Sequence, residues 1–217
     1  KDALRRFGAD PEHPGLCKLH SPGALSVEAD WSNAAFFLAA NTLGSSLDIR
    51  GLNPNSAQGD RAAAWLLPEL TRKALTIDAS DIPDLVPILS VTAACFQGAT
   101  FTNIRRLRLK ESDRVASVIA MLEALGSHAE AGDNTLHIFG TGLVGGTVDS
   151  VNDHRIAMSA AIAAIRCTEP VTILGAQCVQ KSYPKFFDEY RRLGGRYEQS
   201  LMSIMILASC RQEISVS

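Results

Sequence analysis

The pattern of apolar and polar positions along the chain repeats three times. Each repeat begins with an aspartate, continues as a run of small apolar residues with helical spacing, and breaks fourteen residues after the aspartate. A β-like run and then a second helix follow each break. The aspartates are Asp30, Asp84 and Asp153; the breaks are Gly44, Gly98 and Cys167; the β-like runs are Ser46–Arg50, Thr100–Ile104 and Pro170–Leu174; and the second helices begin at Gln58, Ser112 and Lys181.

This repeat predicts a pseudo-threefold α/β domain. An aspartate before a helix satisfies free backbone N–H groups and suits the positive end of the helix dipole. Small residues, as in Ala161–Ala164, let the first helices pack closely. The second helices are amphipathic, and Val115, Ile119, Leu122 and Leu125 mark the apolar face of one of them. The helix starts should therefore gather at one end of the domain, near a common axis.

Two further segments lie between the second and third repeats. His128–Ala131 and Thr135–Phe139, separated by Gly132-Asp133-Asn134, predict a β-hairpin. The glycine-rich segment Gly140–Gly146 carries neither a dinucleotide-binding nor a P-loop pattern, so it is interpreted as a connection.

The two ends differ from the repeats. Residues 1–27 predict a short helix ending near Gly8, a Pro/Gly-rich loop and a weak strand, as expected for the remainder of something longer. The chain also lacks an initiator Met, which favours a processed piece or a fragment. Within residues 198–217, Leu201–Cys210 is apolar and predicts either a packing helix or an altered end.

Composition excludes several classes of protein. The chain has 217 residues, 46% of them hydrophobic, and a net charge of −2, which argues against disorder and against a generic nucleic-acid-coating protein. No apolar run is long enough to span a membrane. Five scattered cysteines without a CxxC motif favour reduced thiols and a cytoplasmic location over a disulfide framework or a zinc site. They are Cys17, Cys95, Cys167, Cys178 and Cys210.

Positive charge gathers at the predicted helix starts despite the acidic average. Convergent Arg and Lys side chains suit a small anion, because Arg grips carboxylate or phosphate with two donors and Lys acts as a point charge. Helix N-termini add backbone donors. These cations are Arg105, Arg106, Arg108, Lys110 and Arg114 in the second repeat, and His154, Arg155, Lys181 and Lys185 in the third.

Asp84 and Glu111 are the candidate acid and base, because each lies beside these cations and a carboxylate near a bound anion can carry a proton. Simpler interpretations stay open for several residues. The Lys110–Arg114 run fits a solvated helix start, Asp84 an ordinary helix cap, and His154 a surface histidine. The remaining histidines have no partner pattern and are interpreted as structural; they are His13, His20, His128 and His137.

Six motifs in order resemble the C-terminal half of the 5-enolpyruvylshikimate-3-phosphate synthase family, over roughly residues 1–195. They are Val27–Ser32, Gln58–Asp60, Asp81–Asp84, Leu109–Arg114, Asn152–Met158, and Lys181–Pro184 with Phe186 and Phe187. The resemblance implies two domains, each built from three βαβαββ units about a pseudo-threefold axis. It places the C-terminal domain at residues 28–197, the end of the N-terminal domain and the crossover at residues 1–27, and a tail of uncertain structure at 198–217.

The resemblance implies transfer of the carboxyvinyl group of phosphoenolpyruvate to the 5-hydroxyl of shikimate 3-phosphate, with release of phosphate, in the route to chorismate and aromatic amino acids. No cofactor, metal, nucleic acid or membrane is implied. The expected partners are the two small-molecule substrates and a missing N-terminal domain. That domain would supply further substrate contacts, so this chain is expected to fold but to be inactive alone.

The family's site residues carry over onto matching positions of this sequence. Asp84 resembles the base that contacts shikimate phosphate near its reacting hydroxyl. Lys110 resembles the lysine that bridges this hydroxyl and phosphoenolpyruvate, and Glu111 resembles the carboxylate that exchanges a proton with the methylene carbon. The remaining matches are Arg114 and Arg155 as the clamp on phosphoenolpyruvate, Lys181 as a phosphate ligand, and His154 as its supporting neighbour.

The sequence departs from the family pattern at two places. Arg106 stands where some members have an asparagine that touches shikimate phosphate, so that role is not assigned to it. The chain between Leu70 and Ile77 is too short for a hairpin after the second helix of the first repeat.

Two alternatives to a transferase fragment stay open at this point. One is a free-standing anion-binding or interaction domain that has lost catalysis. The other is the related transferase that acts on UDP-N-acetylglucosamine, against which the strings Lys110–Arg114 and Asn152–Arg155 argue.

Overall fold

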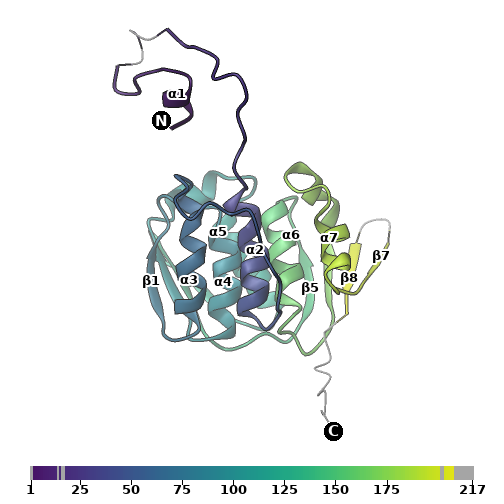
Figure 1. Ribbon diagram of the computed structural model, residues 1–217. Coiled ribbons are helices and arrows are strands. Elements are labelled where there is room, and N and C mark those ends of the chain that lie inside the picture. Colours follow the sequence, from purple (N-terminus) through teal and green to yellow (C-terminus); the bar gives the residue numbers. More distant parts are fainter. Residues whose placement is uncertain (1, 14, 16–17, 201–202, 208–217) are drawn as a thin grey trace.

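Two four-stranded sheets with the same topology flank a group of helices (Figure 1). The structure, a computed structural model, describes residues 2–13, 15, 18–200 and 203–207. The first sheet has the order β1-β2-β4-β3 and the second the order β5-β6-β8-β7. In each, the first two strands are parallel and the remaining pairs antiparallel.

Each sheet, with its two helices, forms one βαβαββ unit. The second repeat comprises β1 (Leu75–Asp78), α4 (Val86–Cys95), β2 (Ala99–Thr102), α5 (Arg114–Ala124), β3 (Ala129–Ala131) and β4 (Thr135–Ile138). The third comprises β5 (Gly146–Asp149), α6 (His154–Ala163), β6 (Val171–Leu174), α7 (Phe186–Arg192), β7 (Tyr197–Gln199) and β8 (Ser203–Ile206). The predicted hairpin is confirmed in the first of these units, and the helix–strand–helix order is confirmed in both. The glycine-rich segment predicted as a connection joins the two units and ends where β5 begins, at Gly146.

The first repeat keeps its helices but has no sheet among the residues described. It consists of α2 (Trp31–Thr42), the 3₁₀ helix η2 (Gly59–Ala62) and α3 (Ala63–Leu70). The predicted strand at Ser46–Arg50 is wrong. Its counterparts β2 and β6 each pair with a parallel strand on one side and a hairpin strand on the other.

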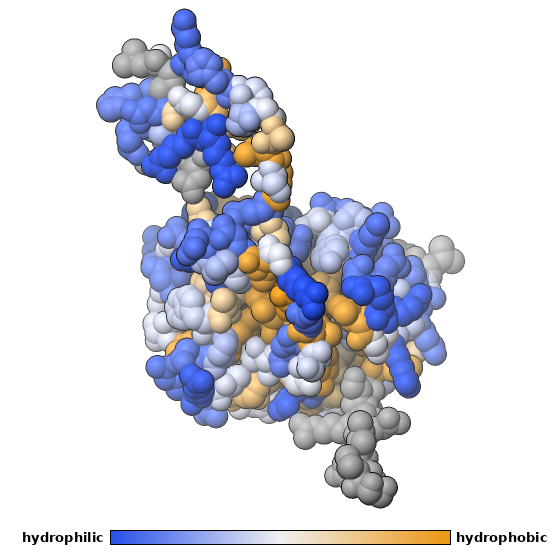
Figure 2. All heavy atoms as spheres, in the orientation of Figure 1, coloured by the Kyte–Doolittle hydropathy of each residue, from blue (hydrophilic) through white to orange (hydrophobic). Residues whose placement is uncertain are grey.

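Ser46–Arg50 lacks both of these partners. Described residues before α2 form no strand, and only four residues separate α3 from β1, which leaves no room for a hairpin. The Asn41 amide instead bonds both backbone groups of Leu47, at 2.8 Å to its carbonyl and 2.7 Å from its N–H. The face beside this segment stays partly apolar, as Figure 2 shows in the middle of the surface over α2 and α6. Phe37, Leu47 and Ile165 line a small pocket there.

The first helices of the three repeats form the centre of the core. All residues of α6 are buried, and so are all residues of α4 except Cys95. A helix that is apolar all round belongs in an interior, and its small residues allow the close approach that the sequence predicted. The extensive contacts of α4 with α6, and of α2 with both, fix the helix starts relative to one another. This rigid centre positions the site.

The chain ends depart from the prediction. The short N-terminal helix is confirmed as α1 (Asp2–Arg6), but residues 18–29 contain no strand. The described residues before Glu28 (2–13, 15 and 18–27) project beyond the end of the domain where α2 begins (Figure 1). Within Leu201–Cys210, Ser203–Ile206 form β8, which pairs with β6, so the packing-helix alternative is wrong for these residues. The second sheet thus continues to Ile206.

The second helix of the third repeat begins later than predicted. Lys181 ends the 3₁₀ helix η4 (Ala176–Lys181), and α7 starts only at Phe186. The reason is Pro184, because a residue that precedes proline is disfavoured in the helical conformation. Lys181 therefore lies at the C-terminal end of a 3₁₀ helix rather than at the N-terminus of α7.

Candidate anion-binding site

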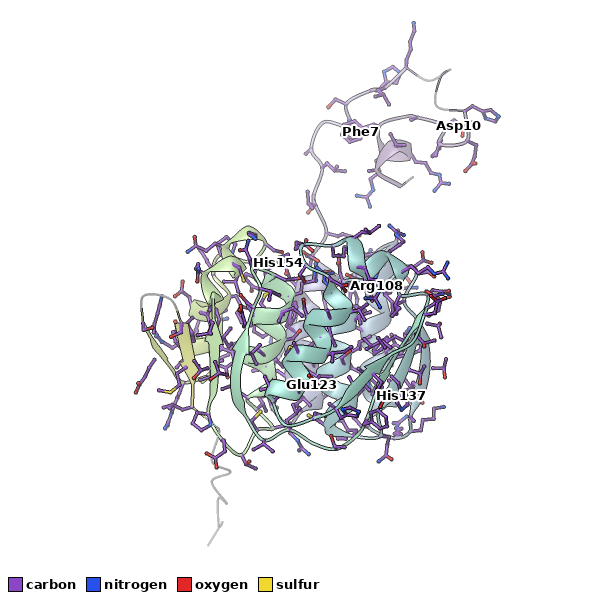
Figure 3. The ribbon with its side chains drawn as sticks, turned by 180° about the vertical axis from the view of Figure 1, so that it is seen from behind. Phe7, Asp10, Arg108, Glu123, His137 and His154 are labelled. Carbon is purple, nitrogen blue, oxygen red and sulfur yellow. The ribbon has the colours of Figure 1, made fainter. Side chains whose placement is uncertain are left out.

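The starts of α5 and α6 lie at one end of the domain, as the repeat predicted. Figure 3 shows Arg108 and His154 at this end, and Glu123 and His137 at the opposite end. Arg108 belongs to the 3₁₀ helix η3 (Arg105–Leu109), which leads into α5. Backbone N–H groups at such helix starts favour negatively charged groups.

A buried arginine is the centre of the site. The Arg114 side chain is fully buried, and its guanidinium binds three carboxylates, which together with it form the Arg114 cluster. Its Nη1 lies 2.7 Å from Asp84 Oδ1 and its Nε 3.0 Å from Asp153 Oδ2, while its Nη2 contacts Glu111. Burial alone would lower the pKa of Arg114, but Asp153 and Asp84 outweigh burial and raise it. Arg114 is therefore a permanent cation that fixes the Asp84 and Glu111 carboxylates.

The Asp84 carboxylate forms ion pairs with three basic side chains and does not cap a helix. Besides Arg114, Lys110 Nζ lies 3.3 Å from its Oδ1 and Arg155 Nη2 lies 3.5 Å from its Oδ2. Burial would raise the pKa of the Asp84 carboxyl, but Arg155, Arg114 and Lys110 together hold that pKa below its usual range. The interpretation of Asp84 as an ordinary cap is wrong, because α4 begins beyond it at Val86, after Leu85, without a side-chain cap.

Asp153 has two roles, and the sequence predicted only one of them, the helix cap. Its Oδ1 caps α6 by accepting the Arg155 backbone N–H at 2.9 Å, as the repeat predicted. Its Oδ2 also accepts from Arg114 and, at 3.1 Å, from the Ser112 hydroxyl. The carboxylate is fully buried, so it depends on these donors. The signal for this second role was the presence of Asp153 in the same motif as His154 and Arg155.

His154 and Lys181 lie at the start of α6. His154 is buried, and among the residues described its Nδ1 has no hydrogen-bond partner. Burial and the neighbouring Arg155 lower the pKa of His154, so its ring is neutral at pH 7. Lys181 is exposed, and its Nζ donates to the Asn152 carbonyl at 2.8 Å. Asn152 holds a left-handed backbone conformation, with φ of 59°, which turns that carbonyl toward Lys181.

We expect His154 to make the stability of the chain depend on pH. Its folded-state pKa lies below the ordinary value of 6.5, so at mildly acidic pH the unfolded chain binds a proton that the folded chain does not. The free energy of unfolding should therefore fall as pH drops below about 6.5. Urea unfolding at pH 7.5 and at pH 5.5 measures this loss of stability. The loss should be smaller in His154→Gln than in the parent chain. The control is His137→Gln, at an exposed position, in which the loss should equal that of the parent chain. An equal loss in His154→Gln and the parent chain would contradict the expectation.

An open cleft of roughly 500 Å³ adjoins the Arg114 cluster, with Asp84 and Arg155 in its wall. Its other lining residues are mostly polar: Asp30, Ser32, Gln58, Gly59, Asp60, Ser80, Asp81, Pro83 and Arg106. Burial raises the pKa of Asp60, to which the Ser32 hydroxyl donates a hydrogen bond. The cleft therefore offers both positive charge and hydrogen-bond acceptors.

Two of the six motifs, Val27–Ser32 and Gln58–Asp60, lie together at the edge of this cleft. The Glu28 carboxylate accepts from Ser56 Oγ at 2.7 Å and from Gln58 Nε2 at 3.1 Å. The Gln58 side chain also accepts the Trp31 backbone N–H at 2.9 Å. These bonds hold the segment that enters α2 against the loop before η2.

Some of the predicted cations lie outside the cluster. Arg105 pairs with Asp133 in the β3–β4 turn, and Arg108 pairs with Asp113. Lys185 is exposed at the start of α7. His137 lies in β4 and hydrogen-bonds with Thr100, and His128 lies just before β3 and hydrogen-bonds with Glu130, so neither belongs to the cluster. Lys110, Arg114 and Arg155, in contrast, converge on Asp84 as predicted.

Known proteins resemble the chain in sequence and in structure. It is 41% identical to the 3-phosphoshikimate 1-carboxyvinyltransferase of Clostridium acetobutylicum, over 89% of this chain and 51% of that protein. It is 38% identical to that of Clostridioides difficile, over 80% and 44%. The EPSP synthase of Acinetobacter baumannii superimposes with a TM-score of 0.70 at 26% identity, over 88% of this chain and 53% of that one.

These matches concern one half of a longer protein. The chain spans about half the length of the curated relatives it matches. Within the residues described, no helix has the length and apolarity needed to cross a bilayer. The family model for EPSP synthase (3-phosphoshikimate 1-carboxyvinyltransferase) matches residues 12–190, which include the whole Arg114 cluster. The chain therefore belongs to the EPSP synthase family.

Proposed function

We propose that the chain supplies one half of the active site of a 3-phosphoshikimate 1-carboxyvinyltransferase. In this proposal residues 28–197 are the C-terminal domain, and residues 1–27 lead into it from the N-terminal domain. The observation that carries the proposal is the convergence of Lys110, Arg114 and Arg155 on the ionised Asp84, in a family member, beside an open cleft. Both substrates are anions that such a cleft suits.

The proposed reaction needs two proton transfers before phosphate leaves. The substrate oxygen bonds to the central carbon of phosphoenolpyruvate, the hydroxyl gives up a proton, and the methylene carbon gains one. Asp84 takes the hydroxyl proton, since its cations keep it ionised. Glu111 donates the proton that the methylene carbon gains, and Arg114 contacts one of the Glu111 carboxyl oxygens. Both carboxylates are partly exposed and can reach a ligand, with side-chain exposures of 31% and 39%.

The second stage breaks the bond from that carbon to the phosphate oxygen, while the methyl group returns a proton to Glu111. Negative charge then builds on the departing phosphate, and positioned cations lower the barrier. In the proposal, Lys110, Arg155 and Lys181 supply the positive charge that stabilises the departing phosphate. Neutral His154 supports the phosphate region. Arg114 has no exposed surface and all three of its donor nitrogens are occupied, so its direct contact with phosphoenolpyruvate stays a prediction.

A reducing compartment such as the cytoplasm suits this chain. Cys95, Cys167 and Cys178 are free thiols, and Cys17 and Cys210 lie outside the described residues. Burial raises the pKa of Cys95 and of Cys167 to about 12, which keeps both thiols protonated and unreactive. They act as small apolar residues.

Exchange of Glu111 for glutamine tests the proposed function. The chain is combined with the complementary half of the Clostridium acetobutylicum relative, and phosphate release is followed with both substrates. Glu111→Gln should lower kcat by about 10²–10⁴-fold, because a positioned acid or base contributes that much, and should change substrate affinity little.

The matched control is Glu123→Gln, an exposed residue near the other end of α5 (Figure 3). This control should retain the parent kcat. Near-normal turnover in Glu111→Gln would remove Glu111 from the reaction. An assembled pair that binds both anions but releases no phosphate would instead indicate an anion-binding domain without catalysis.

A further inference from the structure

The turn that leads from β5 into α6 holds two consecutive residues in the left-handed backbone region. Val151 has a φ of 44° and Asn152 a φ of 59°. The N–H of Asp153 donates to the Ser150 carbonyl at 2.8 Å, so these two residues are the central pair of a β-turn. Asparagine tolerates positive φ, but a β-branched residue such as valine adopts it only with strain. The backbone of this turn is therefore strained at Val151.

Packing of side chains does not account for this strain. Val151 is 45% exposed. The Asn152 side chain is also exposed, and it makes no hydrogen bond within the part of the chain that the structure describes. Backbone strain persists only where the surrounding structure imposes it, and it clusters at functional sites. We therefore looked for a role of the turn in its backbone groups.

Two hydrogen bonds join this turn to η4. The Ser150 hydroxyl donates at 3.1 Å to the carbonyl of Gly175, the residue just before η4. Lys181, the last residue of η4, donates from its Nζ to the Asn152 carbonyl at 2.8 Å. The turn therefore contacts both ends of η4, and the second contact fixes the position of the Lys181 ammonium group.

The Asn152 carbonyl holds Lys181 without neutralising its charge. Among the residues described, Lys181 has no carboxylate partner, whereas Lys110 pairs with Asp84. An ammonium group has three N–H donors, so two of them remain for an anion. A carboxylate in the place of the carbonyl would offset the positive charge that attracts this anion.

We propose that Asn152 is a positioning residue, whose left-handed backbone presents Lys181 to the phosphate of phosphoenolpyruvate. The inference rests on the proposed function, which assigns Lys181 to that phosphate. A lysine side chain has many rotamers, and one that is held before the ligand arrives loses less conformational freedom on binding. The strained turn thus produces a preordered positive charge at the start of α6.

Variants of Asn152 and Lys181 test the proposal in the assembled pair of this chain and the complementary half, with kcat/KM for phosphoenolpyruvate as the measurement. Asn152→Val should lower kcat/KM by roughly 5- to 30-fold, because valine disfavours positive φ and turns the carbonyl away. Asn152→Gly should stay within about twofold of the parent, since glycine adopts positive φ without strain. In a Lys181→Met background, Asn152→Val should have little further effect, because the carbonyl then has no ammonium group to hold.

The matched control is Asn103→Val. Asn103 also has a left-handed backbone, with a φ of 58°, but it follows β2 in the first sheet. Its carbonyl accepts no hydrogen bond from a basic side chain of the described residues. Both valine variants should lose a similar amount of stability in urea unfolding, and only Asn152→Val should lose kcat/KM.

The outcomes separate this inference from the proposed function. Parent-like kcat/KM in Asn152→Val would overturn the inference alone. Equal losses in Asn152→Val and Asn103→Val would also overturn it, because the effect would then be general destabilisation. So would an undiminished effect of Asn152→Val in the Lys181→Met background. Parent-like kcat/KM in Lys181→Met would remove Lys181 from the proposed site, and the inference with it. If the parent pair released no phosphate, the proposed function itself would fail.

Discussion

The chain alone is expected to release no measurable phosphate from phosphoenolpyruvate and shikimate 3-phosphate. Under the proposed function it holds only one side of the reacting pair. Holding two reactants in a productive geometry lowers the barrier by about 7–11 kcal/mol, and a half-site forgoes most of this advantage. The cleft of roughly 500 Å³ is also open, so water and salt screen its cations.

Phosphate release should appear only when the complementary half of the Clostridium acetobutylicum relative is added. Three samples are needed: this chain, the complementary half, and the two together, each with both substrates. Omission of shikimate 3-phosphate from the assembled pair distinguishes transfer from simple hydrolysis. Sustained turnover by the chain alone would show that the other half is dispensable, and would overturn the division of the site between two halves.

Replacement of Arg114 by methionine is expected to lower the free energy of unfolding by about 3–5 kcal/mol. The substitution keeps much of the side chain's volume but removes the cation from three carboxylates. The largest part of the cost should come from Asp153. Its carboxylate is fully buried, and without Arg114 it keeps only the Ser112 hydroxyl and the backbone N–H of Arg155 as donors. A buried charge without its partner costs far more than an exposed one.

Urea unfolding at pH 7 measures this loss. Arg72→Met is the control, because Arg72 forms an exposed pair with Glu69 and its removal should cost less than about 1 kcal/mol. The double variant Arg114→Met with Asp153→Asn should recover part of the loss, because the uncompensated charge is then gone. A loss in Arg114→Met no larger than in Arg72→Met would contradict a structural role of the Arg114 cluster.

Local chemistry made part of this structure predictable. The caps by Asp30 and Asp153 were predicted correctly because each carboxylate bonds backbone groups two or three residues away. The hairpin around Gly132-Asp133-Asn134 followed from turn residues between two alternating runs. The cations of the site were found because the repeat places helix starts at one end.

Contacts between residues far apart in the sequence determine the features that local sequence patterns did not predict. Ser46–Arg50 has a strand-like composition, but a strand needs neighbours, and none is present among the described residues. Ser203–Ile206 fits a helix or a strand by composition, and pairing with β6 makes it a strand. The repeat places Asp84 at a helix-cap position. Its side chain instead contacts Lys110, Arg114 and Arg155 and caps no helix.

The bonds at Arg114 and Asp84 join positions far apart along the chain. Arg114 and Asp153 are 39 positions apart, and Arg155 and Asp84 are 71. Closing loops of that length costs conformational entropy before any contact forms, so such pairs form late in folding. A partly folded chain can close the β3–β4 hairpin, with its short loop, while Asp84, Arg114 and Asp153 are still apart. We therefore expect affinity for anions to be acquired only when the second and third units dock, as a late event in folding.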